Sequence, residues 1–200
     1  MGLASLEYRD WTDSMRKALS IFDEKPESLE IKEIEFAFEA PSQGRFRGYA
    51  IVDGQKIHLC DISDIYPPFA NIKAWLETMT EFNSANRLNT AVLTLDCAGS
   101  VISVMAYHIG WHQDKQYGNR RSHTPVSLFI VHRSGRHAAE LCCFCDTKRT
   151  IKNMYQALMS ALTDYSTVFD RKDTWHSNGI GHQTSSRLRQ QLFSRKIELL

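Results

Sequence analysis

Residues 45–60 read RFRGYAIVDGQKIHLC and carry the clearest secondary-structure signal in the chain. Two stretches of alternating apolar and polar residues, 45–52 and 56–60, flank the dipeptide Asp53-Gly54. Both residues of this dipeptide tolerate positive φ, which a type I′ turn between antiparallel strands requires. The segment therefore predicts a β-hairpin, and the neighbouring segments can be interpreted around it.

Further strand patterns lie on both sides of this hairpin. Upstream, residues 29–40 alternate apolar and charged side chains and predict a half-buried strand. Downstream there are two more pairs of strand-like segments, each around a glycine-containing turn: 90–95 with 101–109, and 125–132 with 138–144. The chain is therefore expected to contain three hairpins.

Apolar residues at a spacing of three and four predict helices over 10–22, 68–83 and 151–169, with a short helix within 186–200. Tight hairpins without alternating βα units indicate the α+β class, with a mainly antiparallel sheet built from three hairpins and helices packed largely on one face. We expect residues 1–170 to form a single domain. Residues 171–200 are expected to be a basic loop and short helix docked on that domain.

The charge of the chain is nearly balanced. Lys and Arg number 24 and Asp and Glu 23, for a net charge of +1, so the field of the whole molecule favours neither nucleic acid nor an anionic membrane. Residues 1–40 hold 5 basic and 10 acidic residues, whereas residues 171–200 hold 6 basic and 2 acidic ones. We interpret both ends as solvated or mutually neutralising. The alternative is a basic tail that contacts an acidic partner.

The sequence carries no signal for export or membrane insertion. It has no stretch of about 20 uninterrupted apolar residues, and the first residues are too acidic for a signal peptide. Five scattered cysteines, an odd number, do not suggest a disulfide framework. We therefore expect a soluble cytoplasmic protein with reduced thiols. Its 171–200 segment docks on its own core or, as the alternative, joins two copies of the chain.

Two spacings invite a metal interpretation. His108 and His112 are four residues apart, but they lie in a strand pattern, where four residues span about 13 Å, too far for one zinc ion. Cys142 and Cys145 also lie in a strand pattern, which sends them to opposite faces. No nucleotide-binding or hydrolase motif is present, so no metal and no cofactor are predicted.

The segment 107–124 is predicted to be a long loop between two hairpins, and loops of that length usually have a function or are mobile. Its chemistry suits an anion or a nucleic-acid backbone, with arginines as bidentate donors and aromatic rings as stacking surfaces. In a catalytic version, two histidines would form an acid–base pair. The alternative is a plain solvated loop. The candidate binding residues are Trp111, His112, Tyr117, Arg120, Arg121 and His123, with His112 and His123 as the acid–base pair.

A second candidate anion site is the start of the long helix, where Lys148 and Arg149 meet free backbone N–H groups. Alternatively, Asp146 or Thr147 caps the helix, and the two cations point to solvent or pair with the acidic N-terminal segment.

The function predicted from these patterns is binding of another macromolecule, most plausibly a protein, by an immunity-like or regulator-like module without catalysis. The alternative is a nucleic-acid-binding or phosphate-binding protein, including a His-dependent phosphodiesterase. A third interpretation is a small-ligand pocket, whose aromatic residues are more simply core residues. These aromatics are Phe36, Phe38, Trp75, Phe82 and Phe129.

Overall fold

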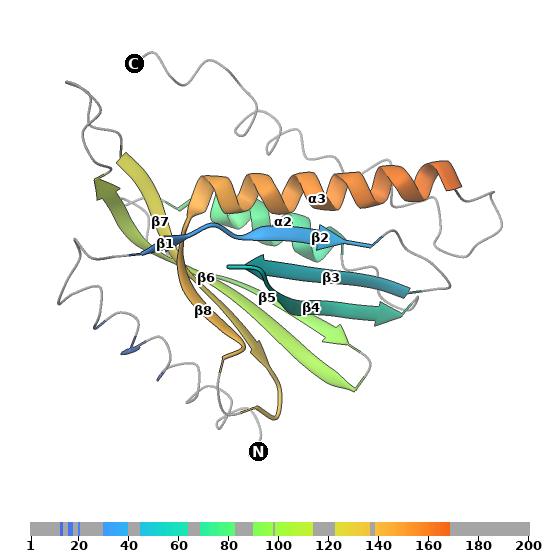
Figure 1. Ribbon diagram of the computed structural model, residues 1–200, viewed down its shortest axis with the longest axis horizontal. Helices are drawn as coiled ribbons and strands as arrows, with labels where there is room; N and C mark the ends of the chain where they lie inside the picture. The colour runs from blue at the N-terminus through green and yellow to red at the C-terminus, as the bar shows by residue number, and fades with distance from the viewer. Residues whose placement is uncertain are drawn as a thin grey trace, which may run out of the picture.

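An α+β architecture is present in the part of the chain that the structure describes. The computed structural model describes residues 30–39, 45–63, 69–82, 90–97, 99–113, 123–136 and 139–168, together with residues 13, 16, 17 and 20 (Figure 1). These residues form a five-stranded sheet, a three-stranded sheet and two helices, α2 and α3. The predicted fold class is confirmed.

The smaller sheet contains the predicted 45–60 hairpin. Its order is β2-β3-β4, with β2 at Glu35–Phe38, β3 at Arg45–Val52 and β4 at Gln55–Ser63, all antiparallel. The turn residues Asp53 and Gly54 both have positive φ, 52° and 78°, as a type I′ turn requires. The hairpin prediction is therefore confirmed, including the position of its turn.

The larger sheet has the order β1-β8-β7-β6-β5. The strands are β1 at Ile31–Lys32, β5 at Thr90–Cys97, β6 at Ser100–Gln113, β7 at His123–Arg133 and β8 at Leu141–Asp146. The two predicted downstream hairpins are confirmed as β5–β6 and β7–β8, and β6 also pairs with β7. Only β1 runs parallel to its neighbour, β8, among the strands of this sheet.

The prediction of a single strand over residues 29–40 is wrong. Its first part, β1, pairs with β8 of the large sheet, and its second part, β2, pairs with β3 of the small sheet. Glu33 and Ile34 separate the two, and Ile34 turns into the core with 1% of its surface exposed. The carbonyl of Ile34 accepts a hydrogen bond from Asn153 Nδ2 of α3 at 3.0 Å. A tertiary contact therefore satisfies the backbone where the strand changes sheets.

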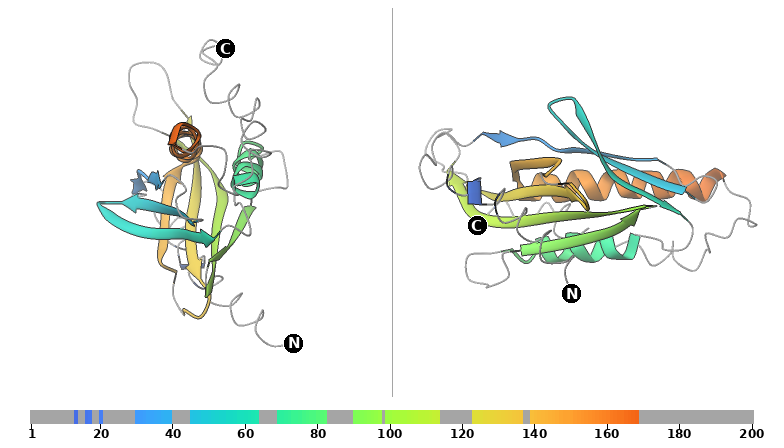
Figure 2. Two further views of the ribbon diagram at one scale, coloured as in Figure 1. Left: turned by 90° about the vertical axis from the view of Figure 1, so that its right-hand side faces the viewer. Right: turned by 90° about the horizontal axis from the view of Figure 1, so that it is seen from below.

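The two helices cover one face of the large sheet. Helix α2 spans Phe69–Met79 and α3 spans Thr147–Val168. In one view of Figure 2, α3 is seen end-on with α2 beside it, and the β3–β4 hairpin lies on the side away from α2. The main core lies between this face, the small sheet and the helices, and a second apolar cluster that includes Leu128 and Ile130 lies on the opposite face.

Two other predictions fall largely outside the described residues. Within the predicted 10–22 helix, only residues 13, 16, 17 and 20 are described; they are helical and exposed. The basic segment 171–200, with its proposed docking or self-association, lies outside the described residues. Neither α2 nor α3, as far as each is described, is long and apolar enough to cross a membrane.

Gly48 provides a test of how the small sheet packs. A Cβ at this position would lie 2.6 Å from Phe38 Cε1 and 2.9 Å from Cys60 Sγ. The Phe38 ring is stacked on Phe46 at 5.4 Å and cannot withdraw without opening that stack. We expect Gly48→Ala to lower the free energy of unfolding by about 1–3 kcal/mol, measured by urea denaturation. Glu35→Ala, an exposed change in the same sheet, should stay within about 0.5 kcal/mol, and an equal loss for both variants would refute this account.

Candidate functional site

The predicted 107–124 loop is shorter in the structure than the sequence suggested. Strand β6 continues to Gln113 and β7 begins at His123, so the ladder includes residues that were assigned to the loop. The register shifts between His108 and Gly110, and Gly110 has φ +136°. This bulge interrupts the alternation of apolar and polar residues and explains why the strand seemed to end there.

The register separates part of the proposed loop site. Trp111 lies opposite Pro125, His112 opposite Thr124, and Gln113 opposite His123, so the two histidines are not cross-strand partners. Tyr117, Arg120 and Arg121 lie outside the described residues. The arrangement of these three residues with Trp111, and the binding role of the group, stay predictions.

His108, Cys142 and Cys145, whose spacings invited a metal interpretation, lie on strands in the structure. His108 is buried and stacks on Phe82 with ring centroids 5.8 Å apart. Cys142 is exposed opposite Ile130, whereas Cys145 is fully buried opposite Ser127, so the prediction that they face opposite ways is confirmed. No group of three or more potential metal ligands occurs among the described residues.

At the start of α3, the capping alternative accounts for the contacts. Asp146 Oδ1 accepts a hydrogen bond from the backbone N–H of Arg149 at 3.0 Å, which is an N-cap. The Arg149 guanidinium forms an ion pair with Glu33, and Lys148 is exposed. Carboxylates from the chain itself therefore occupy the cap and pair with one of the two cations, while anion binding at Lys148 and Arg149 stays an untested prediction.

Beneath this helix start lies a small buried polar cluster. Ser127 Oγ and Thr147 Oγ1 are 2.7 Å apart, and the Cys145 thiol donates to the Ser127 carbonyl at 3.4 Å. Burial raises the pKa of Cys145 to about 12, although a hydrogen bond with Thr150 acts in the opposite direction. The thiol is therefore protonated and closed to solvent at neutral pH, and the cluster joins α3 to β7 and β8 rather than forming a reactive site.

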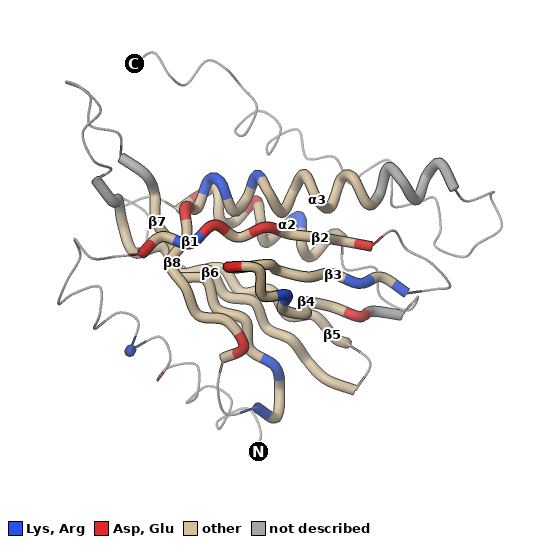
Figure 3. The backbone as a smooth tube through the Cα atoms, viewed as in Figure 1, with Lys and Arg blue, Asp and Glu red and all other residues tan. Residues whose placement is uncertain are grey.

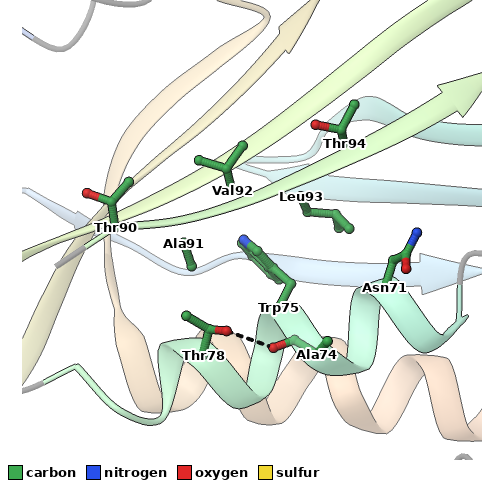
Figure 4. Close-up of a pocket in the computed structure, with 9 residues that line it drawn as sticks. All are labelled: Asn71, Ala74, Trp75, Thr78, Thr90, Ala91, Val92, Leu93 and Thr94. Carbon is green, nitrogen blue, oxygen red and sulfur yellow. Dashed lines mark hydrogen bonds between the residues drawn. The ribbon is translucent and has the colours of Figure 1, made fainter. Parts of the chain in front are cut away.

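A groove of about 440 Å³ lies between α2 and β5 (Figure 4). One stripe of the helix and the first five residues of the strand form its walls. The lining residues are Asn71, Ala74, Trp75 and Thr78 from α2, and Thr90, Ala91, Val92, Leu93 and Thr94 from β5. None of these residues is charged, although α2 carries Lys73 and Glu77 outside the lining; Figure 3 shows further charged positions on β1 to β4, at the β7–β8 turn and at the start of α3.

The groove follows the outer edge of the large sheet. Strand β5 pairs with β6 on one side, and no strand of the described chain pairs with its other side. Val92, at the centre of the lining segment 90–94, is 57% exposed. The opposite edge strand, β1, has only two residues and carries Lys32, which forms an ion pair with Asp53 at 2.8 Å. The β5 edge is thus the longer one and lacks a lysine or proline.

Trp75, which lines this groove, carries a buried polar atom. Its ring packs edge-to-face on Phe129 with centroids 6.1 Å apart, and the side chain is 3% exposed. Its Nε1 has no hydrogen-bond partner among the described residues. Figure 4 shows the ring rising from α2 toward β5 between Ala91 and Leu93, with the nitrogen at its far end. A buried donor left unpaired costs about 1–3 kcal/mol of stability.

The sequence suggested that five aromatic residues belong to the core, but it did not reveal the groove. The interpretation as core residues is confirmed for Phe36, Trp75, Phe82 and Phe129, which are all buried. The alternation of Thr90, Val92 and Thr94 with buried neighbours contained a hint, because Val92 is apolar on the otherwise polar side. That hint does not identify an edge strand, since the order of strands in a sheet is not readable from alternation.

Comparison with known proteins did not add a relative to this picture: no protein-family model matches the chain, and neither the curated proteins nor the solved structures contain a significant match.

His108 provides a pH test of the interior described above. Burial lowers its pKa below the usual 6.5, partly offset by a hydrogen bond with the Val126 backbone. As the pH falls through about 6.5, the unfolded chain binds a proton here before the folded chain does, so stability decreases by up to about 1.4 kcal/mol per pH unit. We expect His108→Phe to reduce this acid-side slope in urea titrations between pH 6.5 and 5. Tyr107→Phe should keep the wild-type slope, and an unchanged slope in His108→Phe would contradict the assignment.

Proposed function

We propose that this protein is a protein-binding module that takes up an extended segment of a partner protein as an added strand along the outer edge of β5. The free edge of β5 beside α2 is the observation that carries the proposal. An edge strand presents a row of unpaired N–H and C=O groups, which an extended peptide can pair, while neighbouring pockets receive alternate side chains.

The dimensions of the groove support a short extended segment. On α2, the lining residues run from Asn71 to Thr78, about 10 Å along the helix axis. On β5 they run from Thr90 to Thr94, about 14 Å along the strand. An extended segment of about four or five residues matches this length. Two or three of its side chains would face α2, because side chains alternate along a strand.

The chemistry of the lining favours a neutral segment over a nucleic acid. Phosphate recognition relies on Lys and Arg, and the groove is lined by threonine, asparagine, alanine, valine, leucine and tryptophan. The nucleic-acid alternative depends on the 107–124 segment, much of which lies outside the described residues, and on the basic start of α3, where Arg149 pairs with Glu33. A regulator-like or immunity-like role inside the cell belongs to the proposal. All five cysteines are free, which fits a reducing compartment.

Val92→Lys tests the proposal. Lysine on an edge strand opposes the pairing of another strand, and an exposed position tolerates the change without loss of fold. Random dodecapeptides selected by phage display on the wild-type protein should bind Val92→Lys about tenfold more weakly, or ~1.4 kcal/mol, in fluorescence titrations. Binding should also slow amide hydrogen exchange in β5.

Val101→Lys is the matched control, because Val101 is, among the residues whose exposure is described, the other exposed valine; it is 38% accessible and lies on β6. Its affinity should stay within twofold of the wild type. Failure to select any peptide, or equal weakening by both variants, contradicts strand addition at β5. A wild-type dimer that Val92→Lys converts to a monomer would assign the edge to a second copy of the chain instead.

A further inference from the structure

We infer that the partner segment adds antiparallel to β5 and, within the groove, forms its hydrogen bonds with the backbone of Thr90, Val92 and Thr94. The segment then needs an N–H group at three alternate positions, whereas the two positions between them face α2 and carry neutral side chains. This inference rests on the proposed strand addition at β5. It defines the class of segment that fits, an extended run without proline opposite these three residues.

The backbone contacts of Val101 show which way the groups of β6 point. The Val101 carbonyl accepts a hydrogen bond from the N–H of Ser134 at 2.8 Å, and the Val101 N–H donates to Ser134 Oγ at 2.9 Å. Ser134 directly follows β7, so both backbone groups of Val101 are turned toward β7 and away from β5. The backbone groups of successive strand residues point to alternate sides, so Ser103, Met105 and Tyr107 are turned the same way.

The register between β5 and β6 carries this pattern onto the edge strand. The opposed pairs are Thr90 with Tyr107, Val92 with Met105 and Thr94 with Ser103. Directly opposed residues of an antiparallel pair exchange either both of their hydrogen bonds or none. Because the three β6 residues are turned toward β7, the N–H and C=O groups of Thr90, Val92 and Thr94 point to the free edge.

The exposure of the β5 side chains agrees with this pattern. Thr90, Val92 and Thr94 are exposed, whereas Ala91 and Leu93 are each only 3% exposed. The backbone groups that an incoming segment needs therefore belong to the residues of β5 that solvent reaches.

The direction of the added strand decides which of its residues need an N–H. In antiparallel addition, the residues opposite Thr90, Val92 and Thr94 form the hydrogen bonds and their side chains face away from α2. The residues opposite Ala91 and Leu93 face the uncharged wall of α2. In parallel addition, the residues that form the hydrogen bonds would instead face α2. We infer the antiparallel arrangement because it is the more stable pairing per residue and continues the direction of the β5–β6 pair.

An ester scan tests the pattern of required N–H groups. The probes are the dodecapeptides selected on the wild-type protein, with each peptide bond replaced in turn by an ester, which removes one N–H without adding bulk. We expect about five- to tenfold weaker binding at three alternate positions, because each loses a hydrogen bond to β5. The two positions between them should change affinity by twofold or less, and they serve as the matched controls.

NMR of the free and bound protein tests the same pattern from the side of β5. In the free protein, the amides of Val92 and Thr94 should exchange at least about tenfold faster than those of Ala91 and Leu93, and peptide binding should remove most of this difference. Antiparallel addition also brings the peptide backbone closest at the non-hydrogen-bonded pairs. We therefore expect nuclear Overhauser contacts from peptide Hα atoms to the Hα atoms of Ala91 and Leu93, and none to that of Val92.

The outcomes separate this inference from the proposed function. If Val92→Lys weakens the peptides but the ester-sensitive positions do not alternate, or the Hα contacts to Ala91 and Leu93 are absent, the inference is overturned and strand addition stands. If no selected peptide is weakened by Val92→Lys, both fail. Slow exchange of Val92 and Thr94 in the free protein, equal to that of Ala91 and Leu93, would show that the edge is already paired and would also overturn both. Alternating ester sensitivity together with the two Hα contacts supports both.

Discussion

The packing around Phe129 holds the two sheets and α2 together. This ring, on β7, is fully buried and meets Phe36 of the small sheet and Trp75 of α2 edge-to-face, each with centroids 6.1 Å apart. Its neighbours across the ladder are small, Ala106 on β6 and then Ala91 on β5. Small residues beside a large one leave room for rings arriving from other layers, and such aromatic contacts add about 0.5–1.5 kcal/mol each beyond burial.

This packing also explains why a polar atom lies buried beneath the edge strand. The Trp75 ring packs on Phe129 and, with Ala91 of the edge strand, lines the groove. The indole nitrogen is therefore carried beneath β5, where the described chain offers it no acceptor. The groove and its donor follow from filling the core, and any binding function of β5 uses a geometry that the core already requires.

Local chemistry explains which parts of the fold were predictable. Asp53-Gly54 encodes its turn within two residues, and the alternating strands on either side encode their inward faces, so the hairpins and the α+β class could be derived. The division of residues 29–40 between two sheets depends on the contact of Ile34 with Asn153, 119 residues away. The end of β6 was also not predictable, because the bulge near Gly110 shifts the register and breaks the alternation on which strand prediction relies.

The candidate site lay beyond sequence reasoning for a related reason, and that reason bears on its use. Whether β5 is central or at an edge depends on the order β1-β8-β7-β6-β5, which no local pattern determines. Once it is an edge, an eight-residue strand with exposed Val92 and neither lysine nor proline is open to pairing. Edge strands are commonly shortened or charged to prevent this, as the two-residue β1 with Lys32 illustrates. The contrast between the two edges of one sheet supports the proposed pairing at β5, and the uncharged lining of the groove then favours a neutral strand.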